Sequence, residues 1–100
     1  MKEKIKRIAN HYGLAKQQRQ LAEECAELIQ ATSKYMRFQE ESYALTVDWT
    51  YLQNVIEEIA DVEIMLEQMK VLLNLSDETV EGVKNIKVNR ELARIKEGSK

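Results

Sequence analysis

The absence of proline constrains the fold of this sequence more than any other feature. The 100 residues contain no proline and only three glycines, the two residue types that most often interrupt or end a helix. Long uninterrupted helices are therefore expected. A chain of this length has room for one domain and not for two. We expect a single all-α domain that spans residues 1–100.

Composition and charge exclude several classes of protein. The chain is 44% hydrophobic and 32% charged, as in a soluble globular domain, and its net charge of −2 does not favour nucleic-acid binding. No apolar run approaches the roughly 18–20 residues that cross a membrane, and the N-terminus lacks the apolar core of a signal peptide. The lone cysteine, Cys25, excludes an internal disulfide and a cysteine-based zinc site. It is typical of a reducing compartment, so we expect a cytoplasmic protein.

Stop and cap signals divide the chain into four expected helices. Gly13 is a C-terminal stop and Ser76 an N-cap. Lys34 and Arg37 suit a last helical turn, where the helix dipole favours cations. A polar loop is expected at about residues 39–46, and the last four residues, EGSK, form a frayed tail. The expected helices are about residues 2–9, Leu14 to Met36 or Arg37, a third from a cap at Thr46 or Asp48 to about Asn74, and about Asp77 to Lys96.

Such a set of helices makes only a small core in a chain of 100 residues. Long helices in small chains often bury a second apolar face by dimerising. We therefore expect a helical bundle of three long helices plus a short N-terminal helix, completed by dimerisation. The sequence does not distinguish a homodimer from a homotetramer built as a dimer of dimers.

The third expected helix carries a charged residue on its apolar seam. Glu58 occupies the position between Val55 and Val62 that the seam spacing would make apolar, and Asp61 lies beside it, three residues on. The other seam positions follow the alternating four- and three-residue spacing of a packed helix interface: Tyr51, Val55, Val62, Met65, Met69 and Leu72.

The second expected helix repeats this arrangement within LAEECAELIQA. Glu24 and Glu27, again three residues apart, project side by side on the flank of the apolar face, whereas Glu23 points more nearly to solvent. Two antiparallel helices with such pairs would bring four carboxylates together. Like charges at this spacing repel one another and lose hydration when buried, so a cation is expected among them. All-oxygen ligands without cysteine or a nearby histidine favour Mg²⁺ or Mn²⁺.

A solvated helix face is the simplest interpretation of either acidic pair alone. The two pairs together, with Glu58 interrupting the seam, favour a metal site. EECAE followed by EEIAD resembles the paired signature of the MazG-like, all-α nucleoside triphosphate pyrophosphohydrolases. The resemblance covers the second and third helices fully and the fourth loosely. The resemblance implies that Mg²⁺ is bound by Glu24, Glu27, Glu58 and Asp61 and that Glu23 positions water. The spacer of 30 residues between Glu27 and Glu58 is long for this family, and we place the excess in the loop.

Basic residues of the fourth expected helix are candidates for binding phosphate. Lys87, Arg90 and Arg94 fall within about 60° of one another on a helical wheel, with Lys84 at the edge of this stripe. Arginine binds phosphate oxygens in a fork, and members of the family use basic residues after the acidic motifs. The alternative is a solvated, dipole-favoured helix end.

Three further residues could contact the base or the sugar of a nucleotide. Gln17 and Gln20 lie on the Glu24 side of their helix, and Trp49 could stack on a base. An aromatic residue at a helix start is more often a core or dimer contact.

These features together favour a metal-dependent enzyme. We expect a nucleotide pyrophosphohydrolase of the house-cleaning type, in which metal-activated water attacks the α-phosphorus of a (deoxy)nucleoside triphosphate. Glu23 or Glu27 would orient that water or take its proton. Carboxylate-bridged di-iron bundles need Glu-x-x-His pairs, and the only histidine, His11, lies outside both acidic helices. The alternative is a non-catalytic oligomerisation or partner-binding module, in which Glu58 would have a salt-bridge partner.

Overall fold

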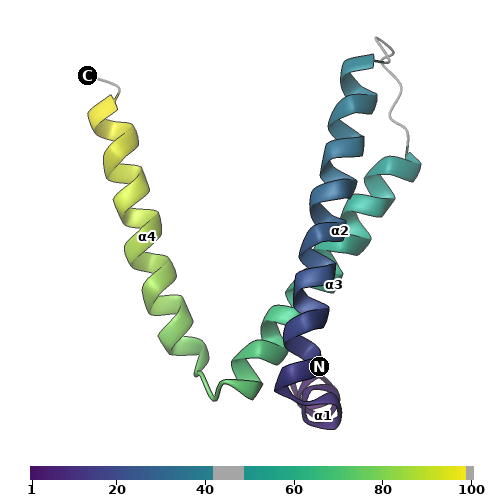
Figure 1. The fold of residues 1–100 in the computed structure, drawn as a ribbon. Helices are drawn as coiled ribbons and strands as arrows, with labels where there is room; N and C mark the ends of the chain where they lie inside the picture. The colour runs from purple at the N-terminus through teal and green to yellow at the C-terminus, as the bar shows by residue number, and fades with distance from the viewer. Residues whose placement is uncertain (42–48, 99–100) are drawn as a thin grey trace.

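The chain folds into helices alone in the computed structural model, which describes residues 1–41 and 49–98 (Figure 1). Within these ranges there is no strand, and the all-α prediction is confirmed. The helices are α1 (Lys2–Tyr12), α2 (Leu14–Glu41), α3 (Trp49–Leu72) and α4 (Asp77–Gly98). No helix in the described ranges combines the length and the apolar character that crossing a membrane requires.

Gly13 separates α1 from α2, as its sequence position predicts. Its φ of 86° lies in the left-handed region that glycine tolerates best. Its N–H donates to the carbonyl of Ala9 at 2.9 Å. α1 reaches Tyr12, three residues further than expected, because the helix continues to its glycine stop.

The far ends of the long helices also differ from the prediction. α2 runs on to Glu41, so residues 39–41 are helical and not the start of a loop, which agrees with the good helix propensity of glutamine and glutamate. α4 includes Glu97 and Gly98 of the expected tail. The proposed caps Thr46 and Asp48, the rest of the loop and the last two residues lie outside the described residues.

A short turn joins α3 to α4. α3 ends at Leu72, and Asn74 has a φ of 55°. The Leu75 N–H bonds to the Lys70 carbonyl at 2.8 Å, and the Asn74 N–H bonds to the Val71 carbonyl at 3.1 Å. These two bonds make a Schellman motif with Asn74 in the left-handed position. Ser76 then caps α4 as predicted, since its Oγ accepts from the Thr79 N–H at 3.2 Å.

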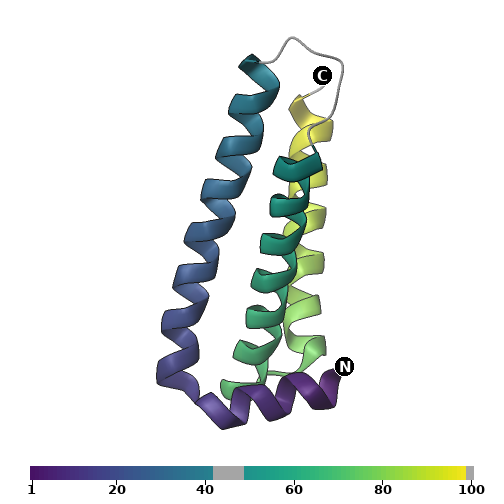
Figure 2. The same ribbon diagram turned by 90° about the vertical axis from the view of Figure 1, so that its right-hand side faces the viewer.

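The packed part of the molecule consists of α1, α2 and α3. α2 and α3 run antiparallel with the most extensive contact between any two elements, and α1 crosses the end where α2 begins and α3 ends (Figures 1 and 2). A hydrogen bond of 2.7 Å from Gln17 Nε2 to Gln68 Oε1 joins α2 to α3 near that end. Among the residues that the structure describes, the buried hydrophobic side chains are few: Ile5, Ala9, Ala31, Val62 and Met65.

α4 lies apart from this packed part. It projects from the turn so that α3 and α4 form the two arms of a V (Figure 1), and none of its residues is buried. The three long helices and the short one are present as predicted, but only α2 and α3 of the long ones pack together within one chain.

Candidate metal centre

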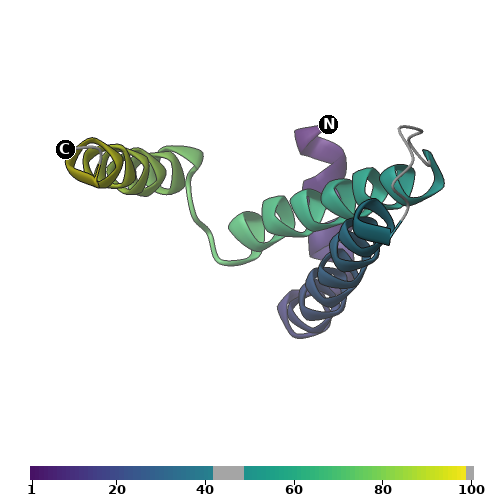
Figure 3. The same ribbon diagram turned by 90° about the horizontal axis from the view of Figure 1, so that it is seen from above.

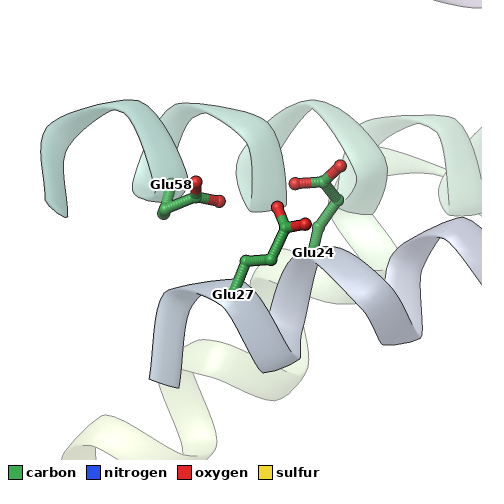
Figure 4. A group of neighbouring side chains, drawn as sticks. All are labelled: Glu24, Glu27 and Glu58. Carbon is green, nitrogen blue, oxygen red and sulfur yellow. The ribbon is translucent and has the colours of Figure 1, made fainter. Parts of the chain in front are cut away.

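The antiparallel packing of α2 against α3 brings the two acidic motifs together. Glu24 and Glu27 of α2 and Glu58 of α3 each offer a carboxylate oxygen, and these oxygens all lie within 4.8 Å of one another (Figure 4). The three-residue spacing puts Glu24 and Glu27 on neighbouring turns of one face. We call these three residues the carboxylate cluster.

Two oxygens of the carboxylate cluster are buried without a partner. Glu24 Oε2 and Glu58 Oε2 are inaccessible to solvent, and neither has a hydrogen-bond partner among the described residues. The other oxygen of Glu24 accepts a hydrogen bond of 2.8 Å from Gln20 Nε2. Buried carboxylate oxygens are normally satisfied, because leaving them unpaired costs free energy. These oxygens therefore suit a cation held between the helices.

The cluster raises the pKa of its own members. The charge of Glu24 is the main cause of the raised pKa of Glu27. For Glu58, burial raises the pKa most, followed by the charge of Glu27. Each cause disfavours a further negative charge in the same place. A divalent cation would offset both the repulsion between the carboxylates and the cost of burying their charge.

Asp61 lies beside the cluster and not within the group of three. Its side chain is exposed, and its pKa is raised first by partial burial and then by the charge of Glu24. The structure thus brings three of the four predicted ligands into one group, with Asp61 electrostatically coupled to it. Glu23 is exposed on α2 and is not part of the group; its water-positioning role stays a prediction.

The basic stripe of the fourth helix is not brought to the carboxylate cluster within one chain. Lys84, Lys87, Arg90 and Arg94 are all exposed on α4, which packs little against the rest of the chain. Lys84 pairs with Glu81 at 3.2 Å and Arg94 with Glu91 at 3.1 Å, both on α4 itself. Their role in phosphate binding stays a prediction, because a single chain does not bring these side chains to the carboxylate cluster.

The three residues predicted to contact base or sugar have separate environments. Gln17 is 5% exposed and its amide donates to Gln68, so it is a core residue and is not part of the proposed site. Gln20 orients Glu24 through its hydrogen bond, a role that the sequence reasoning missed. Trp49 is 71% exposed at the start of α3 and is free to stack on a base.

A groove near the far end of the α2–α3 pair was not predicted. It has a volume of about 310 Å³ and is lined by Lys34, Arg37, Phe38 and Tyr51. The rings of Phe38 and Tyr51 stack with centroids 5.0 Å apart. Lys34 follows Glu27 by seven residues and Tyr51 precedes Glu58 by seven, so the groove lies about 10 Å along the seam from the cluster. The equal spacing of seven residues, from Glu27 to Lys34 and from Tyr51 to Glu58, is the sequence signal that could have predicted this groove.

The arrangement offers oxygen ligands for a hard divalent cation, with cationic and aromatic side chains two helical turns away. Comparison with known proteins adds nothing to this geometry: no protein-family model, curated protein or solved structure matches the chain. Membership of the MazG-like family therefore stays a prediction from the acidic signature.

Proposed function

We propose that this protein is a Mg²⁺-dependent nucleotide pyrophosphohydrolase, with Mn²⁺ as a possible substitute. It would cleave a (deoxy)nucleoside triphosphate to the monophosphate and pyrophosphate in a cytoplasmic house-cleaning role. The observation that carries the proposal is the carboxylate cluster, two of whose oxygens are buried with no hydrogen-bond partner in the described part of the chain. The resemblance of EECAE and EEIAD to the family signature supports the same reaction.

The donor set fits a hard divalent cation. Groups of exposed carboxylates are common in proteins without a metal, so proximity alone would not support a site. Here Glu24 and Glu58 each direct one oxygen into a solvent-excluded position between two helices, and all donors are oxygens, as Mg²⁺ prefers. Glu24, Glu27 and Glu58 would hold the ion, with Asp61 beside them. When bound, the ion would supply charge to the phosphates and lower the pKa of a bound water.

The residues around the cluster have distinct chemical roles in this proposal. Glu27 is exposed, so its carboxylate is placed to take a proton from a bound water. Exposed Glu23 would orient that water. Gln20 fixes Glu24 in place. Basic side chains would bind the phosphate oxygens, from the α4 stripe or from Lys34 and Arg37 in the groove along the seam.

The exposed apolar residues of α4 favour a second candidate, a non-catalytic oligomerisation or partner-binding module. In that case Glu58 should be neutralised by a basic partner. No ion pair of Glu58 is found among the described residues. The pKa of Glu58 is raised, mainly by burial, whereas a basic partner would lower it. The carboxylate cluster therefore favours the enzyme.

A panel of nucleotides decides between the two candidates. The protein is incubated with canonical and modified nucleoside triphosphates and Mg²⁺, and the products are scored as monophosphate and pyrophosphate. The proposal predicts equal amounts of both products and none when EDTA replaces Mg²⁺. Release of orthophosphate would exclude attack at the α-phosphorus. No turnover together with no binding of Mg²⁺ or Mn²⁺ by calorimetry would favour the non-catalytic module.

A further inference from the structure

The two carboxylate oxygens of Glu24 have different environments. Oε1 accepts a hydrogen bond of 2.8 Å from the side-chain amide of Gln20, one turn earlier on α2. Oε2 is closed to solvent and has no hydrogen-bond partner among the described residues. One oxygen of Glu24 points towards Glu27 and Glu58, and the other points away from them (Figure 4). Gln20 lies on the far side of Glu24 from Glu27 along α2, so Oε2 is the oxygen that faces the cluster.

Helix geometry places Gln20 to make this contact. The side chains of a helix lean towards its N-terminus, so the carboxylate of Glu24 lies over the turn that contains Gln20. Both residues are half-buried, which restricts the positions that the amide and the carboxylate can take. The hydrogen bond therefore fixes which oxygen of Glu24 is free.

The hydrogen-bond donor to Glu24 is neutral. An amide donates a hydrogen bond without cancelling the charge of the carboxylate, whereas lysine or arginine would bring a positive charge. α4, which carries the basic stripe, lies apart from α2 and α3 within one chain (Figures 1 and 3). Glu24 thus keeps its negative charge for a cation, while only one of its oxygens is free to bind that cation.

The number of oxygens that a carboxylate can offer distinguishes Mg²⁺ from Ca²⁺. Mg²⁺ needs near-octahedral geometry at about 2.0–2.1 Å and keeps several bound waters. Ca²⁺ takes about six to eight oxygens at about 2.3–2.6 Å and is often bound by both oxygens of one carboxylate. Binding through both oxygens of Glu24 would break the hydrogen bond from Gln20, so this hydrogen bond disfavours the coordination that Ca²⁺ uses.

We propose that Gln20 is a positioning residue that restricts Glu24 to one ligand oxygen and thereby favours Mg²⁺ over Ca²⁺ at the carboxylate cluster. This inference rests on the proposed function, because it requires that the cluster binds a divalent cation. It adds a determinant of ion choice that is not itself a ligand. A hydrogen bond that only stabilised α2 would change the melting midpoint and leave the preference between the two ions unchanged.

Calorimetry tests the role of Gln20 with each ion alone and without nucleotide. The metal-free protein is titrated with MgCl₂ or CaCl₂, and the Kd for Ca²⁺ divided by the Kd for Mg²⁺ is compared between wild type and Gln20→Met. Methionine keeps the length of glutamine and removes the donor. Loss of a residue that orients a metal ligand weakens metal binding about 10–100-fold. Mg²⁺ binding should weaken by this amount, whereas Ca²⁺ should lose less because Oε1 becomes a second ligand, so the ratio should fall about 10-fold.

Control variants separate this role from charge and from helix stability. Gln20→Lys keeps an N–H donor beside Oε1, so it should restore the wild-type ratio, although its positive charge weakens the binding of both ions. Gln18→Met makes the same substitution at an exposed position of α2 and should leave both Kd values unchanged. If circular dichroism shows that Gln20→Met does not fold, Gln20→Ala replaces it, because alanine also lacks a donor and favours a helix.

The possible outcomes distinguish this inference from the proposed function. A wild-type protein that binds Mg²⁺, with a ratio that Gln20→Met and Gln20→Ala leave unchanged, would overturn the role of Gln20 and leave the proposed function standing. A wild-type protein that binds Ca²⁺ more tightly than Mg²⁺ would also overturn that role. A wild-type protein that binds neither ion would overturn the metal site, and the role of Gln20 with it.

Discussion

Glu58 illustrates what a single residue contributes to this protein. It occupies a seam position between Val55 and Val62, where an apolar side chain would pack against α2. Its carboxylate faces Glu27, and one of its oxygens is buried with no hydrogen-bond partner among the described residues. Without a cation, its charge can only reduce the stability of the fold, because burial and like charge both oppose ionisation. A residue that destabilises the protein in this way is best explained by a ligand that the fold alone does not supply.

The variant Glu58→Gln should therefore have opposite effects with and without metal. In EDTA its melting midpoint should lie a few degrees above that of the wild type, since the amide keeps the size and removes the repulsion. The increase in midpoint on addition of Mg²⁺ should be lost, and turnover should fall at least about 100-fold, as for loss of a metal ligand. Glu57→Gln is the matched control, because Glu57 is exposed and outside the cluster, and it should keep the Mg²⁺ response. A variant of Glu58 that retains full turnover would exclude it as a ligand.

At the scale of elements, the alignment of α2 with α3 creates the cluster. The same antiparallel register pairs Gln17 with Gln68 at one end, Glu27 with Glu58 in the middle, and Phe38 with Tyr51 at the other end. The Gln17–Gln68 hydrogen bond is buried, with 5% and 2% of the two side chains exposed. A buried amide pair of this kind penalises any slip that separates its partners. It therefore helps to hold the carboxylates at their spacing.

Gln68→Leu should destabilise the fold by about 1–3 kcal/mol, because it leaves the buried Gln17 Nε2 without its acceptor. The double variant Gln17→Leu with Gln68→Leu should recover most of this loss, since both polar groups are then removed. Urea denaturation at one protein concentration measures the two single variants, Gln17→Leu and Gln68→Leu, and the double variant. Gln18→Leu, at an exposed position of α2, should change stability by less than about 0.5 kcal/mol. Additive losses in the double variant would show that the two amides are not coupled.

At the scale of the whole molecule, two sets of charges respond to pH in opposite directions. Asp77 accepts from Lys2 at 2.6 Å and from Lys70 at 3.1 Å, and these partners lower its pKa. The carboxylates at the α2–α3 seam have raised pKa values instead. The ion pairs of Asp77 tie α1 and α3 to the start of α4 and add stability at neutral pH, whereas the seam carboxylates remove it there in the absence of metal.

This contrast predicts how the metal-free protein responds to pH. A raised carboxyl pKa means that the folded state binds more protons than the unfolded state, so this contribution to stability is present at low pH and is lost as pH rises. In EDTA, the melting midpoint of Glu58→Gln minus that of the wild type should be near zero at about pH 3.5 and positive at about pH 7.5. Asp77→Asn should show the reverse, with a lower midpoint than wild type at neutral pH and little difference at low pH. A difference for Glu58→Gln that does not change with pH would contradict the raised pKa.

The sequence by itself determined the helical class, the stop at Gly13, the cap at Ser76 and the two acidic pairs, because each depends on residues within a few positions of one another. The ends of α2 and α3 were misplaced, since helix propensity changes little across Gln39–Glu41, and the left-handed Asn74 has no strong local signal. Only the tertiary structure decided which residues face each other. It buried Gln17 in the core and directed the amide of Gln20 to the carboxylate of Glu24. It also placed Lys34 and Tyr51 in one groove. It also separated the basic stripe of α4 from the carboxylates, because a short turn fixes the direction of α4 and no periodicity within a helix encodes that direction.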